Sequence, residues 1–217
     1  MSIERLLRLL KRSPTGAVFN PWWQTDEAND IGSRAPRIRR EQLRAYLTER
    51  LGKARIALIG EALGYRGGHF SGIAMTSERV LLEGIQRRRV LSTIEPRRTS
   101  LPERWPRGFA EPTASIVWSA LLGLGLAVDA FVLWNAFPWH SFDRDKGLLS
   151  NRAPTRAELV VGALVLKAFL NLFPEVRVVA VGRHAAAQLP SAECVRHPAS
   201  AGATLFRRQI AALVRSY

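Results

Sequence analysis

The stretch Ala54-Arg55-Ile56-Ala57-Leu58-Ile59-Gly60 decides the fold class, because it is a short apolar run that ends in glycine. Such a run predicts a strand that is buried on both faces of a sheet. Three similar runs follow at residues 128–134, 176–181 and 193–196, of which the last is the weakest. These runs predict the remaining strands of the same sheet.

Helical patterns separate the predicted strands. Apolar side chains recur at helical spacing over residues 76–89, 113–126, 155–173 and 203–215. Thr155 and Glu158 have the spacing of a capping box at the start of the third helix. Strands that alternate with helices form right-handed βαβ units. The expected fold is therefore an α/β, three-layer α/β/α sandwich with a central, mostly parallel, four-stranded sheet.

The first 39 residues are expected to pack on this sandwich, so that residues 1–217 form a single domain. Residues 2–12 place apolar side chains at helical spacing between arginines, which predicts an amphipathic helix rather than a signal peptide. Residues 24–39 mix charge, Gly and Pro, which predicts an extended surface segment.

Three further local predictions concern the middle of the chain. A helix is expected from about Arg40, with Gly52 as its C-terminal cap. The tract Arg87-Arg88-Arg89 is expected at a helix end, where its charge complements the helix dipole. Residues 93–112 are rich in Pro and Arg, which predicts a mobile insertion.

The charge balance points to a polyanionic partner. The chain has 32 Lys plus Arg against 18 Asp plus Glu, a formal net charge of +14. Basic groups near phosphates release condensed counterions and so add affinity for nucleic acid. The alternative is that the charge only keeps the protein in solution.

The composition also excludes several classes of protein. No stretch has 18 uninterrupted apolar residues, so we expect no membrane span. Cys194 is the single cysteine, which excludes an internal disulfide and a multi-cysteine zinc or iron–sulfur site and fits a reducing cytoplasm. We expect a cytoplasmic monomer without a cofactor.

Ligands of parallel α/β sheets bind at the carboxyl ends of the strands, so the loops there carry the functional information. The glycines at positions 60, 64, 67 and 68 fit neither a dinucleotide fingerprint nor a Walker loop. The four histidines lie on different segments, with no carboxylate at metal-ligand spacing. Both a nucleotide cofactor and a metal site are therefore disfavoured.

Asn135 and His197 are the polar side chains of these loops that suit base chemistry. An amide offers one donor and one acceptor together, which matches the edge of a nucleobase. A histidine can donate to an oxygen that gains charge as a base leaves a sugar. Taken singly, an Asn in this position is more often a turn residue, and a His before Pro is more often a surface-loop residue.

Four elements, taken in order, resemble motifs of the uracil-DNA glycosylase superfamily. Residues 60–78 begin with Gly60-Glu61-Ala62-Leu63-Gly64 and resemble its first motif in the GEAPG form. Asn135 resembles the uracil-binding Asn, and Asn151-Arg152-Ala153-Pro154 is similar to the N-R-x-P segment of the iron–sulfur branch. Gly182-Arg183-His184-Ala185-Ala186 resembles the G-x-x-A element, and His197-Pro198-Ala199-Ser200 resembles the HPS motif. The resemblance covers roughly residues 54–217.

The resemblance implies a DNA repair enzyme that flips uracil out of single- or double-stranded DNA and hydrolyses its N-glycosidic bond. His197 and Asn135 would be catalytic, with Asn135 binding the O4/N3 edge and His197 stabilising charge on O2. The other substrate-binding residues implied are Gly60, Glu61, Ala62, Gly64, Tyr65, Phe70 and Met75. The DNA-binding residues expected around the pocket mouth are Arg66, His69, Arg183, His184, Arg196, Ser200, Ala201 and Arg207. A solvated Arg-rich face is the alternative for any single one of these.

At several positions the sequence departs from the family pattern, and the residues that would fill the corresponding roles are not identified by the motifs. Ala62 stands where the best-known branch has a water-activating Asp, so the sequence does not name a base. Met75 replaces the stacking Phe, with Phe70 as an alternative, and the cluster cysteines are absent. Ala201 replaces the wedge Leu, a role that Leu205 or Phe206 would then take.

Two other functions follow from these observations. The departures at Ala62, Met75 and Ala201 allow a catalytically weak protein that binds uracil or damaged DNA on the same fold. A general basic nucleic-acid binder or a phosphate-ester enzyme is the third possibility, which the ordered motifs disfavour.

Overall fold

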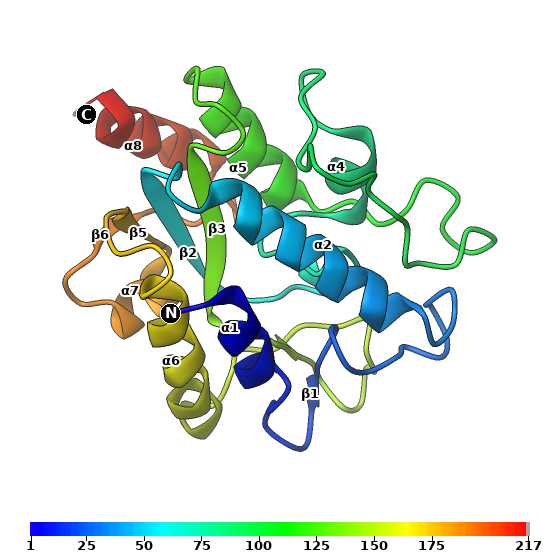
Figure 1. Cartoon of the computed structure of the whole chain (residues 1–217). Coiled ribbons are helices and arrows are strands. Elements are labelled where there is room, and N and C mark those ends of the chain that lie inside the picture. The colour runs from blue at the N-terminus through cyan, green and yellow to red at the C-terminus, as the bar shows by residue number, and fades with distance from the viewer. Residues whose placement is uncertain (216–217) are drawn as a thin grey trace.

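A parallel sheet forms the centre of the protein, for which the computed structural model describes residues 1–215. The strands are β2 (Ile56–Ala62), β3 (Phe131–Phe137), β5 (Arg177–Val181) and β6 (Glu193–Val195). Their order across the sheet is β3-β2-β5-β6, and every neighbouring pair is parallel. The expected α/β class and four-stranded sheet are confirmed (Figure 1).

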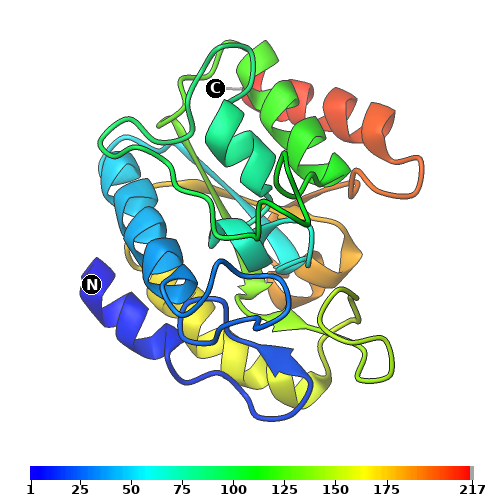
Figure 2. The same cartoon turned by 90° about the vertical axis from the view of Figure 1, so that its right-hand side faces the viewer.

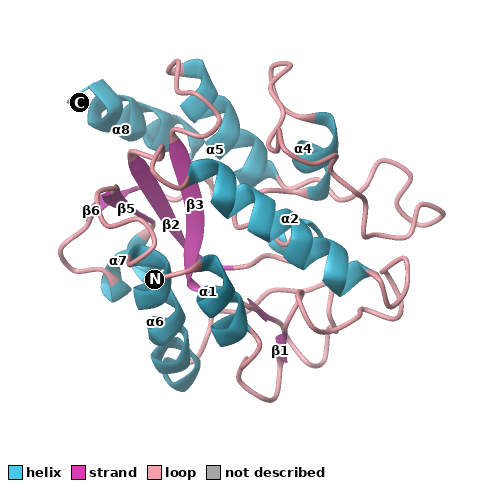
Figure 3. Cartoon of the chain, in the orientation of Figure 1, coloured by secondary structure: helices cyan, strands magenta, loops and turns pink. Residues whose placement is uncertain are grey.

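Helices cover both faces of this sheet. On one side lie α5 (Pro112–Gly123) and α8 (Ala203–Arg215), which pack side by side (Figure 2). On the other side α6 (Arg156–Leu170) packs on β3, and α7 (Arg183–Gln188) packs on β2 and β5. Figure 3 shows the strands enclosed between these helices. The central strands β2 and β3 are buried over most of their length because both faces are covered.

The N-terminal part adds two helices and a small sheet. α1 (Ile3–Leu10) buries its apolar side against α6 and α2 (Ala35–Arg50), as the amphipathic pattern predicted. β1 (Val18–Phe19) pairs antiparallel with β4 (His140–Ser141). The chain before α2 is therefore joined to the loop that follows β3, next to the carboxyl end of the sheet.

Two predictions about this N-terminal part were wrong. α2 begins at Ala35 rather than near Arg40, because Pro36 lies in its first turn, where a missing N–H costs nothing. The preceding residues are not an extended surface segment either. Asp26, Asn29 and Asp30 are buried there, where the Asp26 N–H donates to the Asp30 carboxylate at 2.9 Å and the Asn29 amide donates to the Asp26 carboxylate at 3.0 Å.

The middle of the chain has less helix than the apolar pattern predicted. α3 (Gly68–Ser71) and α4 (Glu78–Glu83) are short, and α4 stops because Gly84 adopts φ +73°. The arginine tract 87–89 therefore lies in a turn, not at a helix end, and Arg87 itself has φ +63°. Residues 93–111 form a loop that includes Thr99 and Ser100, whose backbone N–H groups donate to Glu78 at 2.7 and 2.9 Å.

The helix ends at the site agree closely with the sequence. α6 starts with the predicted capping box, in which Thr155 accepts from the Glu158 N–H and Glu158 accepts from the Thr155 N–H. α8 has the predicted bounds. No helix among residues 1–215 is long and apolar enough to cross a membrane.

Candidate active site

A cavity of about 390 Å³ lies where the loops after β2, β3 and β6 meet. Pockets for small ligands have volumes of about 300–1,000 Å³. The predicted site residues that line it are Gly60, Glu61, Ala62, Gly64, Met75, Asn135 and His197. Its other lining residues are Leu63, Glu111, Thr113, Asn151, Arg152, Ala153 and Ala199. The structure thus brings together both predicted catalytic side chains and most of the predicted substrate contacts.

Gly60 and Asn135 are neighbours because parallel pairing places them side by side on β2 and β3. A β-carbon at position 60 would lie 2.6 Å from an amide atom of Asn135 and 3.4 Å from the sulfur of Met75. Glycine is therefore required for this side chain to reach the cavity. Met75 has φ +46°, a left-handed conformation that is uncommon for a residue with a side chain. Such strained residues often occur at functional sites.

The Asn135 amide is held by the backbone and still has hydrogen-bonding capacity. In the amide orientation that satisfies both neighbours, its oxygen accepts from the Leu63 N–H at 3.3 Å, and its nitrogen donates to the Trp134 carbonyl at 3.1 Å. An amide has two donors and two acceptor lone pairs. One donor and one acceptor therefore remain on a side chain that lines the cavity.

The His197 ring is fixed in one tautomer. Its Nδ1 accepts from the Ala199 N–H at 3.1 Å, so the neutral ring carries its proton on Nε2. Burial, aided by the charge of Arg196, lowers the pKa of His197. Gly182, with φ +89°, lies directly against it, since a β-carbon there would be 3.0 Å from the His197 β-carbon. His197 is therefore a neutral N–H donor at physiological pH.

Asn151 and Arg152 join the first loop to the segment before α6. The Asn151 side-chain oxygen accepts from the Tyr65 N–H at 3.0 Å. Arg152 forms an ion pair with Glu158 at 2.6 Å and also donates to the carbonyls of Ala17 and Phe142. Asn151 was quoted in a motif but not predicted as a site residue, although it lines the cavity.

Glu111 is the cavity residue that the sequence did not indicate. It is the residue before α5, and its carboxylate lies over Gly64 and Gly67. A β-carbon on Gly64 would lie 2.8 Å from one carboxylate oxygen, and one on Gly67 would collide with the other. Burial raises the pKa of Glu111 to about 7. The only signal in the sequence was the pair of glycines that leave room for it.

Two predicted substrate contacts lie elsewhere. Phe70 is fully buried and stacks on Phe109 at a centroid distance of 4.0 Å, so the prediction that it packs on the base is wrong. Tyr65 lies in the neighbouring hollow, where its hydroxyl accepts from Arg66 at 2.8 Å. Neither side chain lines the cavity that contains Asn135.

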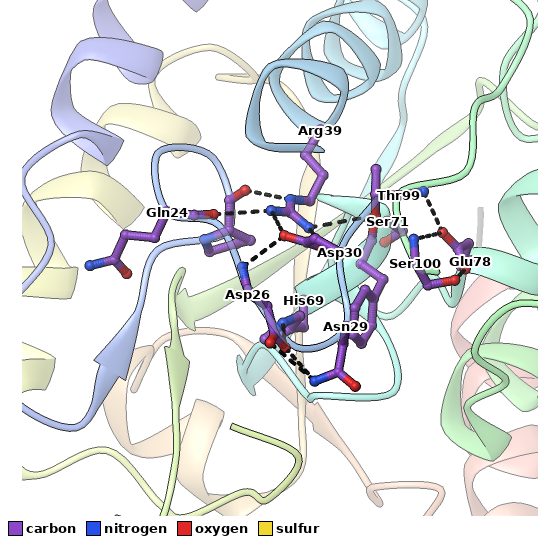
Figure 4. Close-up of polar contacts among 12 residues, drawn as sticks. Gln24, Asp26, Asn29, Asp30, Arg39, His69, Ser71, Glu78, Thr99 and Ser100 are labelled. Atoms are coloured by element: carbon purple, nitrogen blue, oxygen red, sulfur yellow. Dashed lines mark hydrogen bonds and ion pairs between the residues drawn. The ribbon is translucent and has the colours of Figure 1, made fainter. Parts of the chain in front are cut away.

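His69 was predicted to contact DNA, and that prediction is wrong. Its ring is fully buried, stacks on Phe19, and contacts Asp26 at 3.2 Å and the His140 ring at 3.0 Å. It belongs to a group that we call the buried polar cluster (Figure 4). The cluster consists of Asp26, Asn29, Asp30, Arg39, His69, Glu78, Thr99, Ser100 and His140. A side chain inside it cannot reach a DNA phosphate.

The other predicted DNA contacts are exposed. They are Arg66, Arg183, His184, Arg196, Ser200, Ala201 and Arg207. Ser200 and Ala201 have φ of +52° and +61°, so the loop after His197 turns sharply there. Phe206 is fully buried and cannot act as a wedge, which leaves the partly exposed Leu205 as the candidate. The contacts themselves stay predictions.

The comparison with solved structures identifies the fold. No protein-family model matches the chain, and no curated protein matches it in sequence. The crystal structure of SMUG2 from Pedobacter heparinus is similar, with a TM-score of 0.59 over 98% of this chain and 96% of that chain, at 12% identity. The chain therefore has the fold of the uracil-DNA glycosylase superfamily, of which that SMUG2 is a member. The sequence motifs had predicted this fold.

Proposed function

We propose that this protein is a monofunctional DNA glycosylase that flips uracil out of DNA and hydrolyses its N-glycosidic bond. The observation that carries the proposal is the pairing, in one cavity, of an amide with a free donor and acceptor and a neutral histidine N–H. Uracil presents a carbonyl and an N–H on one edge and a second carbonyl beside the glycosidic bond. Asn135 complements the first edge, and His197 complements the second carbonyl.

The two side chains act at different stages of the reaction. Asn135 binds O4 and N3–H of the flipped base and so selects uracil over cytosine, whose amino group would face the amide N–H. As the C1′–N1 bond breaks, negative charge builds on uracil O2. The Nε2–H of neutral His197 donates to that oxygen and stabilises the leaving base. A donor already aimed at developing charge costs no reorganisation in the transition state.

The charge of the surface supports binding of the DNA strand that contains the uracil. The net charge is +14, and the exposed arginines Arg66, Arg183 and Arg196 lie in the segments that follow β2, β5 and β6. Phosphate contacts of this kind hold the strand in register while the base itself is bound in the pocket.

The test is release of free uracil from a uracil-containing oligonucleotide, single- and double-stranded, followed by alkaline cleavage of the abasic product. We expect release by the wild type and a loss of about 10²–10³-fold in His197→Ala, the usual effect of removing one such donor. Lys167→Ala is the control, because Lys167 is exposed on α6 and does not line the cavity. A wild-type chain that releases no uracil contradicts the proposal.

A binding protein without turnover is the second candidate, favoured by Ala62 and by the absence of a leucine at position 201. The same oligonucleotide distinguishes it. Retention of labelled uracil-DNA without release of base supports this candidate, whereas release at catalytic turnover excludes it.

A further inference from the structure

The Glu111 carboxylate lies in the cavity wall and makes no hydrogen bond or ion pair that would stabilise the fold, within residues 1–215. It occupies the N-cap position of α5, yet its side chain makes no capping hydrogen bond. Pro112 follows it and has no N–H to offer. Within residues 1–215, no hydrogen bond or ion pair to the Glu111 carboxylate is formed. The side chain is instead turned over Gly64 and Gly67 and into the cavity wall.

The position of this carboxylate fits the function that the first loop lacks. Ala62 provides no group able to take a proton from water, although it lines the same cavity. Glu61 also lines it, but the Glu61 carboxylate lies 3.8 Å from the His184 ring at the exposed rim. Arg152 is paired with Glu158. Glu111 is thus the carboxylate that shares the cavity with Asn135 and His197 and has no partner there.

We propose that Glu111 is the general base that activates the hydrolytic water, an assignment that rests on the glycosylase function proposed above. The water oxygen forms a bond to C1′ while the C1′–N1 bond breaks and its electron pair leaves with uracil. The water proton passes to the Glu111 carboxylate, and the charge on the departing uracil is stabilised by the His197 N–H. Glu111 then returns its proton to solvent, which regenerates the enzyme, and the uracil anion takes up a proton from solvent. The products are free uracil and an abasic sugar.

The environment of Glu111 suits proton transfer near neutral pH. A general base works best when its pKa lies near the working pH, and burial raises that of Glu111 to about 7. Glu111 is the residue at the N-terminus of α5, where the helix dipole favours a negative charge. The other ionisable groups that line the cavity are Glu61, Arg152 and His197.

The experiment measures single-turnover uracil release by wild type and Glu111→Gln between pH 5 and pH 9. We expect Glu111→Gln to lose about 10²-fold or more at pH 8, within the range for general-base catalysis. DNA affinity should stay within about threefold, because the amide has the shape of the acid. The wild-type rate should rise with pH through an apparent pKa near 7, and the variant should lose that rise. Glu103→Gln is the matched control, since Glu103 is exposed on the same loop.

A second variant tests the carboxylate by itself. Glu111→Ala should recover part of its rate in added formate, whereas His197→Ala should not, because only the first lacks a base. A merely structural Glu111 would not give this rescue.

The outcomes separate this assignment from the proposed function. If wild type releases uracil and Glu111→Gln keeps both its rate and its pH dependence, the assignment is overturned and the glycosylase function stands. Loss of DNA affinity with the pH dependence intact also overturns it, because Glu111 would then be a substrate contact. If wild type releases no uracil, the proposed function fails and the assignment fails with it.

Discussion

The cavity and the buried polar cluster use the same kinds of side chain in opposite ways. In the cluster, Arg39 donates to both Asp30 oxygens at 2.7 and 2.9 Å and to the backbone carbonyls of Pro21 and Gln24. In the cavity, Asn135, His197 and Glu111 each keep hydrogen-bonding capacity that no neighbour uses. Paired groups hold loops together, whereas free groups are available to a ligand. The number of internal partners therefore separates stabilising residues from functional ones.

The cluster also explains how the loops at the cavity stay in place. His69 follows the first loop, and His140 follows β3. The Nδ1 atoms of the two rings are 3.0 Å apart. The Nε2 atom of His140 also lies 2.7 Å from the carbonyl oxygen of Ser150, the residue before Asn151. Contacts inside the cluster thus connect the segments that carry Gly64, Asn135 and Asn151.

The largest expected effect on the cavity side comes from Asn135→Ala. We expect uracil release to fall by about 10³-fold or more, because a base-binding group and its selectivity are lost together. The free energy of unfolding should fall by only about 1 kcal/mol, since the amide bonds only two backbone groups. Single-turnover assays and urea denaturation measure the two quantities. If Asn135→Ala instead lost several kcal/mol of unfolding free energy, Asn135 would be a stabilising residue like those of the buried polar cluster.

The largest effect on the cluster side comes from Arg39→Met. Removing one partner leaves Asp30 as a buried, uncompensated charge, which costs about 3–5 kcal/mol of unfolding free energy. Molecules that remain folded should keep the wild-type rate of uracil release. The matched control is Arg37→Met on the same helix, whose ion pair with Glu41 is exposed and should contribute under about 1 kcal/mol. A catalytic defect in folded Arg39→Met would show that the two regions are coupled.

Acid should weaken the cluster. Burial, with the charge of His69, lowers the pKa of His140 from 6.5 to about 3. Unfolded His140 takes up a proton below pH 6.5 that the folded ring refuses until about pH 3, so stability is lost as pH falls across this window. The groups that face His140 are His69, Asp26 and Asn151.

Urea denaturation at pH 6.5 and pH 4.5 measures this loss for wild type and His140→Gln. The glutamine keeps a donor for the Ser150 carbonyl but cannot titrate. We expect the wild type to lose about 2 kcal/mol more than the variant over this interval. Equal losses would mean that His140 is protonated in the folded protein.

The smallest effect concerns the rim of the cavity. Arg183→Gln should weaken binding to uracil-DNA slightly and reduce the slope of log affinity against log salt by about 1, because one phosphate contact is lost. Arg8→Gln on α1 is the control, since Arg8 is exposed but is not among the predicted DNA-binding residues. Fluorescence anisotropy across a salt series measures both slopes. An unchanged slope would remove Arg183 from the DNA-binding surface.

Much of the fold and part of the site could be predicted from local pattern. The strand β2, predicted at residues 54–60 and found at Ile56–Ala62, and the capping box at Thr155 depend on neighbours in sequence, so apolar runs and spacing revealed them. Gly60 and Asn135 lie near the carboxyl ends of β2 and β3, and His197 follows β6; parallel strands bring such positions to one edge of the sheet. The helix start before Arg40 and the stop at Gly84 were missed because a proline in a first turn and a left-handed glycine override apolar periodicity.

The sequence by itself determined the sheet, the order of its loops and the two side chains suited to a nucleobase. Only the tertiary structure decided that His69 is a buried partner of Asp26, and that Glu111, from an irregular Pro- and Arg-rich segment, enters the cavity. The physical reason is that a polar side chain in a loop has no periodicity to show which way it points. Its neighbours are set by packing between distant segments, and that packing also left the Glu111 carboxylate without a partner beside Asn135 and His197.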